Sequence, residues 1–257
     1  MNRIFKIRCI TNLHVGSGES NFNIIDNEVE KDAVTGYPTV HASGIKGALR
    51  DNDAILTDKT KEYYIFGKPE KSDEAGSGGN YKFFDAKLLS RPLRVSGDPM
   101  LAYIPVTTVT AINEFIETSA LFGCNVGKTD KLDVNFGESN FISNVDNIKI
   151  EGEAASKYSG TDEAFLKSIL GEKFAICKSF DDYPLPIVAR NKLDENGISK
   201  NLWYEEFVPH TSTFWMIVLC PDSNFYLDIE SKPIQLGANS STGKGFVTFE
   251  SLTKAGE

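Results

Sequence analysis

The sequence predicts an α+β protein with a ferredoxin-like core, in the order βαββαβ, that carries large insertions. Three observations support this class. An opening strand precedes a short helix at 43–50, and paired strand-like segments at 81–106 precede a long amphipathic helix at 107–121. The chain then closes with strand-like segments around a glycine-rich loop at 236–246. We expect residues 1–257 to form one domain around this core.

The opening strand is predicted over residues 3–13. Apolar Phe5, Ile7 and Cys9 alternate there with basic residues, and a period of two is typical of a strand with one buried face. Glycine and serine residues at 16–20 then predict the start of a long loop.

Three helices are predicted from the spacing of apolar residues. The first covers 43–50, where Ser43 is the expected N-cap. The second covers 107–121, and acidic residues open the third at 162–170. Between them, the polar residues 70–80 predict a surface loop.

Residues 187–208 predict a β-hairpin that projects from the body of the protein. Asn196-Gly197 lies between two extended arms, and this dipeptide is a strong signal for a tight hairpin turn. The arms hold several cations and few apolar residues, so they have little surface to bury. By contrast, the apolar run at 213–220 predicts a buried strand.

The composition disfavours several classes of protein. The chain carries 27 basic and 36 acidic residues, a net charge of −9. No segment reaches the roughly 18 apolar residues of a membrane span, and no signal-peptide core is present, so we expect a cytoplasmic protein without a membrane partner. The four cysteines form no CxxC pair, which disfavours a structural zinc site. The acidic net charge disfavours nucleic-acid binding. Residues 82–94, however, hold four cations and one acid, so a basic groove is an alternative.

The loop LGANSSTGKGF differs from a phosphate-binding P-loop at several points. Five residues rather than four separate Gly237 from Gly243, and Gly245 stands after Lys244 where Ser or Thr would hold magnesium. A strand-like segment follows where a helix should receive the phosphate. Nucleotide hydrolysis is therefore disfavoured. The loop either presents backbone N–H groups to a phosphate chain or is a plain flexible hairpin.

Four side chains have both a structural and a functional interpretation. Asp26 follows an apolar pair in a polar loop, and by position alone it is more often a solvated carboxylate than a catalytic one. Lys46 and Arg50 share one helix face, which either grips consecutive phosphates or is a solvated basic face. Trp203 either stacks on a base or anchors the hairpin.

Several segments occur together in an order found in a known family. They are LHVGSG, DAVTGYPTVHASGIKGALR, FFDAKLLSRPLRVSGDPMLAYIP, ARNKLDENGISKNLWYEEFVP and LGANSSTGKGF. With these motifs over nearly its whole length, the chain resembles the RAMP proteins of type III CRISPR-Cas systems. Within that family it is most similar to the backbone subunit of the Cmr (type III-B) effector.

The resemblance implies a modified RNA-recognition-motif core whose copies stack along a guide RNA into a helical filament with other type III subunits. Each copy inserts a thumb, here the hairpin at 187–208, that displaces a nucleotide from guide–target pairing at six-nucleotide intervals. The target RNA is cut beside each displaced position, and a divalent metal ion, Mg²⁺ or Mn²⁺, is required. The ligands of that metal are unknown from the sequence.

The resemblance also assigns roles to residues. Asp26 matches the catalytic aspartate of the family. The implied RNA-binding residues are Ser43, Lys46, Arg50, Arg190, Lys192, Trp203, Gly237, Gly243, Lys244 and Gly245. The chain departs from the family in the acidic stretch 27–31, where Pro and Arg are usual, and at Gly44 and Ala238.

Three functions follow as alternatives. The first is a guide-RNA-binding backbone subunit that cuts target RNA, and the second is a scaffold of the same filament without cleavage. The third is a RAMP endonuclease that processes precursor guide RNA with a histidine such as His14. Loss of regularly spaced target cuts on substitution of Asp26 distinguishes the first function from the second.

Overall fold

The computed structural model describes residues 2–16, 24–52, 58–69, 76–222, 224–230 and 232–253. Its helices are α1 (Ala42–Arg50), α2 (Lys59–Phe66), α3 (Val109–Leu121) and α4 (Glu163–Leu170), with a short 3₁₀ turn, η1 (Ser240–Thr242). Its strands are β1 (Arg3–Cys9), β2 (Thr39–Val40), β3 (Gly67–Lys68), β4 (Ser77–Gly78), β5 (Lys82–Phe83), β6 (Ala86–Ser96), β7 (Tyr103–Thr108), β8 (Phe141–Ser143), β9 (Lys149–Ile150), β10 (Glu153–Lys157), β11 (Ala175–Cys177), β12 (Ile187–Leu193), β13 (Ser199–Glu206), β14 (Thr213–Leu219), β15 (Ile234–Gln235) and β16 (Phe246–Ser251). The predicted mixture of helices and strands is confirmed.

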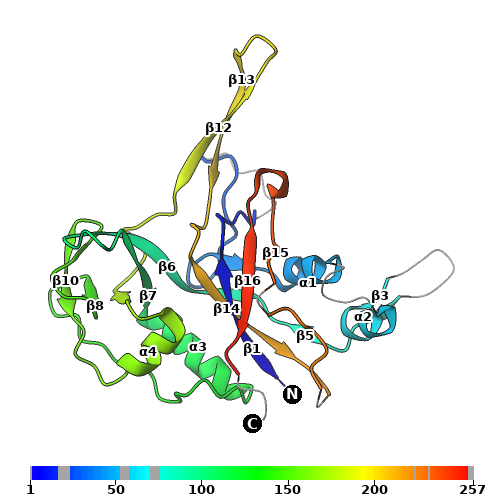
Figure 1. Ribbon diagram of the computed structural model, residues 1–257, viewed down its shortest axis with the longest axis horizontal. Coiled ribbons are helices and arrows are strands. Elements are labelled where there is room, and N and C mark those ends of the chain that lie inside the picture. The colour runs from blue at the N-terminus through cyan, green and yellow to red at the C-terminus, as the bar shows by residue number, and fades with distance from the viewer. Residues whose placement is uncertain are drawn as a thin grey trace.

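One large sheet organises the molecule (Figure 1), and its strands follow the path β15-β16-β1-β14-β6-β7-β11-β8-β10-β9. The long strand β6 is shared by two regions of this sheet. Its first half pairs with β14 through residues 87–90, and its second half pairs with β7 and β9 through residues 91–96. Because β9 returns to β6, the strands β6, β7, β11, β8, β10 and β9 close into a ring.

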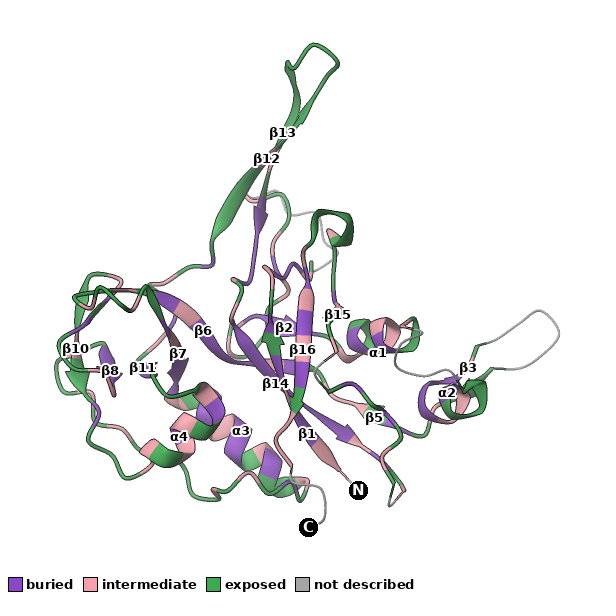
Figure 2. Cartoon of the chain, viewed as in Figure 1, coloured by how far each residue is buried: buried purple, intermediate pink, exposed green. Residues whose placement is uncertain are grey.

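The central strands are buried on both faces. On β14, Phe214 and Met216 pack into one hydrophobic core, whereas Trp215 and Ile217 pack into a second core on the opposite face. Helices α3 and α4 cover the second core, and α1 and α2 contribute to the first. Figure 2 shows the resulting buried centre. Continuous apolar sequence in β14 follows from this double burial, as predicted for 213–220.

The order of the strands differs in one respect from the pattern that the sequence suggested. The segments at 81–106 pair as β6 and β7, but β7 does not lie between β1 and β6. That place belongs to β14, which comes more than a hundred residues later and pairs antiparallel with both neighbours. The long helix α3 therefore follows a strand of the closed ring.

The predicted helices are confirmed, with corrections at their N-termini. Helix α1 begins at Ala42, so Ser43 is not its N-cap; His41 occupies the cap position and makes no side-chain cap bond. Instead, the Ala42 N–H donates to Asp85 Oδ1 at 2.7 Å, a cap supplied from a distant segment. The Thr108 side chain caps α3, and α2 was not predicted. Part of the loop predicted at 70–80 lies outside the described residues.

The hairpin of β12 and β13 projects from the body as predicted (Figure 1). Its turn is closed by the Asp194 side chain, whose Oδ1 accepts the N–H groups of Asn196 and Ile198, both at 2.9 Å. Gly197 has a φ of +77°, the left-handed conformation that such a turn requires. We call β12, β13 and their turn the thumb, and its attached end the thumb root. None of the described helices is long and apolar enough to cross a membrane.

Candidate nucleic-acid interface

The thumb root brings Asp26 next to a strand that lies far along the chain. The backbone N–H of Tyr204 donates to Asp26 Oδ2 at 2.8 Å, across 178 residues of sequence. In return, the N–H groups of Asp26 and Asn27 both donate to the Tyr204 carbonyl at 3.1 Å, and the Glu206 N–H donates to the Asn27 carbonyl at 2.9 Å. Residues 26 and 27 therefore run beside the base of β13 and hold the exposed Asp26 carboxylate against the thumb.

A buried carboxylate organises the adjacent part of the root. Glu205 accepts hydrogen bonds from Arg190 Nη1 at 3.0 Å, from Trp203 Nε1 at 2.8 Å and from Asn239 Nδ2 at 3.2 Å. Burial opposes ionisation of Glu205, but the bonds from Trp203 and Arg190 outweigh it and lower the pKa of this carboxyl. Asn239 Oδ1 also accepts from Arg190 at 3.0 Å, so the thumb and the glycine-rich loop are tied together.

Two predicted RNA-binding residues, Arg190 and Trp203, form hydrogen bonds within this network. The indole N–H of Trp203 is engaged by Glu205, which supports the anchoring interpretation, and the Arg190 guanidinium lies 5.7 Å from the centre of the Trp203 ring. The charge of Arg190 is largely compensated inside the protein. Lys192, further along β12, is exposed and stands away from the root.

A second buried carboxylate fixes the loop that carries Asp26. Glu206 accepts the Val29 N–H at 3.1 Å and pairs with Lys31 Nζ at 3.0 Å. Its backbone carbonyl lies 2.8 Å from Nδ1 of the buried His14. Because a carbonyl oxygen only accepts, His14 carries a proton on Nδ1, and in the neutral ring Nε2 is the acceptor.

The glycine-rich loop packs directly on the segment that follows β1. Gly237 has a φ of +73°, and a Cβ at this position would lie 2.3 Å from the His14 carbonyl oxygen. Gly245 has a φ of +80°, and its Cβ would lie 2.0 Å from the Leu236 carbonyl oxygen. Both positions therefore require glycine, and the loop is a shaped structure rather than a plain flexible hairpin. The Cβ of Gly243, by contrast, would enter open space.

Lys244 lies within this loop, close to the thumb root. Its ammonium group stands 3.2 Å from the centre of the Phe207 ring, a cation–π contact. Burial and the neighbouring Arg190 lower the pKa of Lys244. The structure thus joins Arg190, Trp203 and the glycine-rich loop at the thumb root, and it places Asp26 on the backbone of Tyr204, the residue after Trp203.

Helix α1 forms a separate part of the candidate interface. Ser43 and Arg50 are exposed and Lys46 is half-buried, while Ile45 and Leu49 fix the opposite face in the core. Arg50 Nε lies 3.2 Å from Oδ1 of the neighbouring Asp51, an exposed pair that leaves most of the guanidinium in solvent. Figure 1 shows α1 beside β15, the strand that leads into the glycine-rich loop.

The basic stretch at 82–94 does not form the groove that its composition suggested. Lys87 pairs with Glu114, and Arg94 pairs with Glu151 at 2.8 Å. Arg91 is only 3% exposed. The cations at 87, 91 and 94 are therefore paired or buried rather than free on one open surface.

Glu205 and Asn239 are site residues that the sequence did not single out, and Tyr204 is a candidate from the sequence only through its ring, next to Trp203. The acidic pair Glu205-Glu206, at the end of an extended arm just before Phe207, was a usable signal, since neighbouring carboxylates in a strand need partners. Tyr204 contributes its backbone, which no side-chain pattern reveals. Asn239 depends on a contact between segments 34 residues apart.

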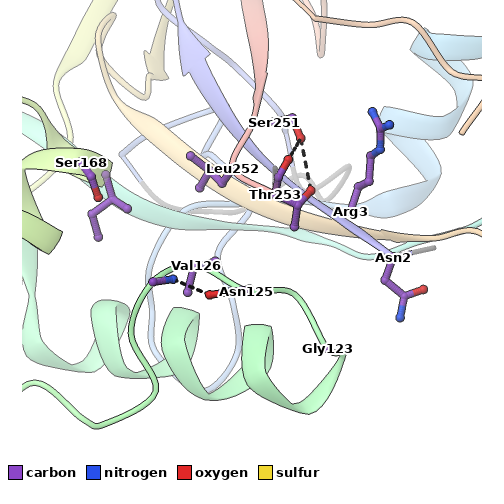
Figure 3. A pocket seen from close by; sticks show the side chains of 11 residues that line it. Asn2, Arg3, Gly123, Asn125, Val126, Ser168, Ser251, Leu252 and Thr253 are labelled. Carbon is purple, nitrogen blue, oxygen red and sulfur yellow. Dashed lines mark hydrogen bonds between the residues drawn. The ribbon is translucent and has the colours of Figure 1, made fainter. Parts of the chain in front are cut away.

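A cavity of about 590 Å³ at the other end of β1 has no such chemistry (Figure 3). It is bordered by residues from the ends of β1, α3 and β16, and by Ser168 of α4. Its polar groups pair locally, as when Ser251 Oγ donates to the Thr253 carbonyl at 3.1 Å. Arg3, a cation on its border, lies 3.8 Å from Glu230.

The comparisons with known proteins agree with the motifs. A family model described as the RAMP superfamily matches residues 6–248. The CRISPR system Cmr endoribonuclease Cmr4 of Pyrococcus furiosus is 29% identical, over 96% of this chain and 95% of that protein. Among solved structures, an apo-state type III-B Cmr-beta chain has a TM-score of 0.73 at 20% identity, covering 99% of this chain and 98% of that one. An oligomeric Cmr4 crystal structure from Pyrococcus furiosus has a TM-score of 0.66 at 19% identity, with 97% of each chain covered.

Proposed function

This chain belongs to the RAMP superfamily, and from that premise we propose that it is a backbone subunit of a type III-B CRISPR effector. In this role it binds guide RNA, assembles with further copies of itself and other effector subunits, and cleaves target RNA paired to the guide. The similarity to a protein named as a Cmr endoribonuclease, over almost the full length of both chains, supports the proposal.

One observation carries the cleavage part of the proposal: Asp26 is held against the thumb. Its Oδ2 accepts the Tyr204 N–H at 2.8 Å, whereas its Oδ1 has no hydrogen-bond partner among the described residues. The side chain is exposed and its orientation is fixed by the backbone of β13. A catalytic group in this reaction must lie beside the RNA phosphodiester that the thumb distorts, and a position next to the thumb meets this requirement.

The chemistry follows from the structure of RNA. The 2′-hydroxyl of a ribose attacks its own phosphate when it lies in line with the departing 5′-oxygen, and A-form pairing prevents this geometry. A hairpin that wedges into the duplex and displaces one nucleotide relieves the constraint, at a cost of about a few kcal/mol by analogy with base flipping. The Oδ1 atom of Asp26 then accepts the hydroxyl proton, and a positioned base of this kind contributes about 10² to 10⁴ in rate.

His14 is the second group that we place in this reaction. Its Nδ1–H is used by the Glu206 carbonyl, so Nε2 of the neutral ring is available to accept a proton. A Cβ at position 16 would lie 3.3 Å from that Nε2, a tight contact. The precursor-processing alternative also relies on a histidine such as His14, and loss of single-site trimming by the isolated protein on His14→Ala would favour it.

We propose that the RNA backbone lies along α1 and the glycine-rich loop. Ser43, Lys46 and Arg50 offer a hydroxyl and two cations on one helix, and the turn around Gly243 exposes backbone without a Cβ. Such contacts recognise the phosphates and the A-form shape of the RNA. The target sequence is recognised by base pairing with the guide.

A divalent ion, Mg²⁺ or Mn²⁺, also belongs to the proposal. Among the described residues no group of three or more His, Cys, Asp or Glu side chains is placed to hold a metal. The donor set still fits Mg²⁺, which is commonly bound by one or two carboxylates together with substrate phosphates and water. As the alternative to accepting the proton itself, Asp26 would supply that carboxylate, and the ion when bound would stabilise charge that develops on the phosphate.

Two finer statements are likewise proposals. We assign β16, β1, β14 and β6 to a ferredoxin-like sheet, because their order and antiparallel pairing match that arrangement and α1 lies in the first crossover. A cytoplasmic location is supported by the cysteines, all four of which are free and buried.

The decisive experiment uses the assembled complex with guide RNA and a complementary target RNA. Asp26→Asn keeps the Tyr204 hydrogen-bond geometry but removes the base, so we expect fragments at six-nucleotide spacing to disappear while target binding is retained. Asp133→Asn, the same change at an exposed aspartate between α3 and β8, is the matched control. Unchanged cleavage by Asp26→Asn would contradict the catalytic role. If the wild-type complex bound target without cutting it, the chain would be a scaffold, and single-site trimming of precursor RNA would indicate the processing endonuclease.

A further inference from the structure

The side chain of Lys244 ends in an ammonium group that is not yet engaged. Lys244 is half-buried, and within the part of the chain that the structure describes Nζ has no hydrogen-bond acceptor and no carboxylate in ion-pair contact. Its neighbour is the ring of the buried Phe207, whose centre lies 3.2 Å away. An aromatic face attracts a cation, but it does not satisfy three N–H donors as oxygen atoms would. These donors are therefore available to a ligand.

The backbone fixes the position of this side chain. The Lys244 N–H donates to the Asn239 carbonyl at 3.3 Å, and the Gly245 N–H donates to the Asn12 carbonyl at 2.9 Å. Gly243, on the other side of Lys244, has open space where a Cβ would stand. The loop thus holds the ammonium group in one place and leaves room for the backbone of a ligand to approach it.

The Phe207 ring connects Lys244 to His14. The centres of the Phe207 and His14 rings lie 5.5 Å apart, at an edge-to-face angle of 63°. Lys244 and His14 therefore contact the same aromatic side chain. His14 donates its Nδ1–H to the carbonyl of Glu206, the residue before Phe207, so in the neutral ring Nε2 is an acceptor and does not donate a proton.

The same short segment also holds Asp26. The Tyr204 N–H donates to Asp26 Oδ2, and Tyr204 precedes Phe207 by three residues. Three residues of chain span at most about 10 Å between Cα atoms. Asp26 and Lys244 are thus held by two backbone positions of one short segment. A phosphodiester with an acid on one side and a base on the other needs hydrogen-bond reach of about 3 Å to each.

The surroundings of Lys244 favour loss of its proton. Burial lowers the pKa of Lys244, the charge of Arg190 lowers it further, and Glu205 opposes the shift. Glu205 is already bonded to Arg190, Trp203 and Asn239. A lysine with a lowered pKa remains a cation at neutral pH and is a better proton donor than a lysine in water.

The proposed cleavage reaction includes a base, Asp26, and it also needs an acid. As the bond from the 2′-oxygen to phosphorus forms, the bond from phosphorus to the 5′-oxygen breaks, and that oxygen leaves as an alkoxide unless it receives a proton. We propose that Lys244 is the general acid of target cleavage and donates a proton from Nζ to the 5′-oxygen. The inference rests on the proposed function and adds a group to the same site.

The protons and bonds of this step balance. The 2′-hydroxyl gives its proton to Asp26, and the ammonium group gives one to the 5′-oxygen. The products are a 2′,3′-cyclic phosphate and a 5′-hydroxyl. Neutral Lys244 then regains a proton from solvent, and Asp26 returns its proton to solvent.

The test compares two target RNAs in the assembled complex with guide RNA and Mg²⁺. One target is unmodified, and in the other a sulfur atom replaces the bridging 5′-oxygen at one cut position. A thiolate is a much weaker base than an alkoxide, so it leaves without a proton. Loss of a general acid therefore slows cleavage of the oxygen linkage and spares the sulfur linkage.

Lys244→Arg is the informative variant, because arginine keeps the positive charge but does not release its proton. It should cut the oxygen linkage at least about 100-fold more slowly than wild type, and the sulfur linkage within about threefold of the wild-type rate. Target binding should match wild type. Lys244→Gln should lose cleavage of the oxygen linkage in the same way and bind RNA more weakly. Lys173→Arg, the same change at an exposed lysine between α4 and β11, is the control and should match wild type on both linkages.

Two results for Lys244→Arg would overturn the inference. Equal losses on the two linkages would show that Lys244 only positions the phosphate, and a wild-type rate on the oxygen linkage would show that charge alone is needed. If Lys244→Gln does not assemble, Lys244→Arg still decides, because it retains a cation beside Phe207. Wild-type fragments supply a measurement that needs no variant: they should carry a 5′-hydroxyl, and a 5′-phosphate would overturn the inference.

Failure of this inference is distinguishable from failure of the proposed function. If wild type and Lys244→Arg cut the oxygen linkage equally, the inference would be overturned and target cleavage by this chain would stand. If the wild-type complex cut neither linkage, the cleavage part of the proposed function and the role of Lys244 would both be overturned.

Discussion

The glycine-rich loop owes its shape to single residues. Gly237 and Gly245 both adopt left-handed backbone conformations and both approach a carbonyl oxygen more closely than a Cβ allows. Asn239 adopts a φ of +65° between them and directs its amide to Arg190 and Glu205. The loop is therefore held at two points by backbone contact and at its centre by the thumb.

Gly245→Ala should destabilise the protein by at least about 2 kcal/mol, because the new Cβ would meet the Leu236 carbonyl in a strained conformation. Gly243→Ala is the matched control, since it has a φ of +75° but open space around its Cβ, and about 1 kcal/mol is expected there. Urea unfolding measures both values. Equal losses in the two variants would show that φ alone, and not the contact, selects glycine at position 245.

At the scale of the element, the thumb depends on its root. A two-stranded hairpin is marginally stable in water by itself, and most of β12 and β13 is exposed, including Leu202 at 53%. The hairpin is held to the body at its root, where Glu205 and Glu206 are buried and where residues 26 and 27 run beside β13. The segment that carries Asp26 and the thumb therefore form one structural unit, and movement of one displaces the other.

Helix α1 acts as an element through its shared exposed face. Combined Lys46→Gln and Arg50→Gln substitution should weaken guide-RNA binding equally for unrelated guide sequences. For each RNA phosphate that the double variant no longer neutralises, the slope of log affinity against log salt concentration should become shallower by about 0.7.

Filter binding across a salt series checks this expectation. Lys173→Gln, an exposed cation between α4 and β11, is the control and should leave the slope unchanged. A loss of binding for some guide sequences and not for others would contradict a role restricted to the phosphate backbone.

At the scale of the whole molecule, an acidic protein with a net charge of −9 binds a polyanion only if its charges are arranged unevenly. In the described residues many cations pair with acids, whereas Lys46 of α1 and Lys244 of the glycine-rich loop are not in such a pair. The Asp26 loop remains acidic, which suits a cation between it and the RNA phosphates.

Removal of divalent ions should therefore stop target cleavage without unfolding the protein. We expect EDTA to abolish the spaced fragments and added Mg²⁺ or Mn²⁺ to restore them. The thermal unfolding midpoint should not change, because the described residues contain no multi-ligand metal cluster that would contribute to stability. Full cleavage in EDTA would remove the metal from the proposal and leave Asp26 and His14 as the acting groups.

Local sequence by itself determined the elements whose signals lie in neighbouring residues. Asn196-Gly197 specified the thumb turn, the apolar run of β14 specified a buried strand, and the spacing of apolar side chains specified α3. These predictions succeeded because turn conformation and periodic burial depend on adjacent positions. The family motifs likewise identified Asp26 and the glycine-rich loop as candidates.

Only the tertiary structure decided which of these elements meet. It inserted β14 between β1 and β6, placed Asp26 against Tyr204, and paired Arg190 with Glu205. Long-range pairing is selected by the burial of whole faces and by the satisfaction of buried polar groups, and neither quantity exists until the chain is folded. The type of a residue determines which groups it is able to bind. The packing of distant segments determines which of those groups are near it, and whether its side chain is already engaged inside the protein.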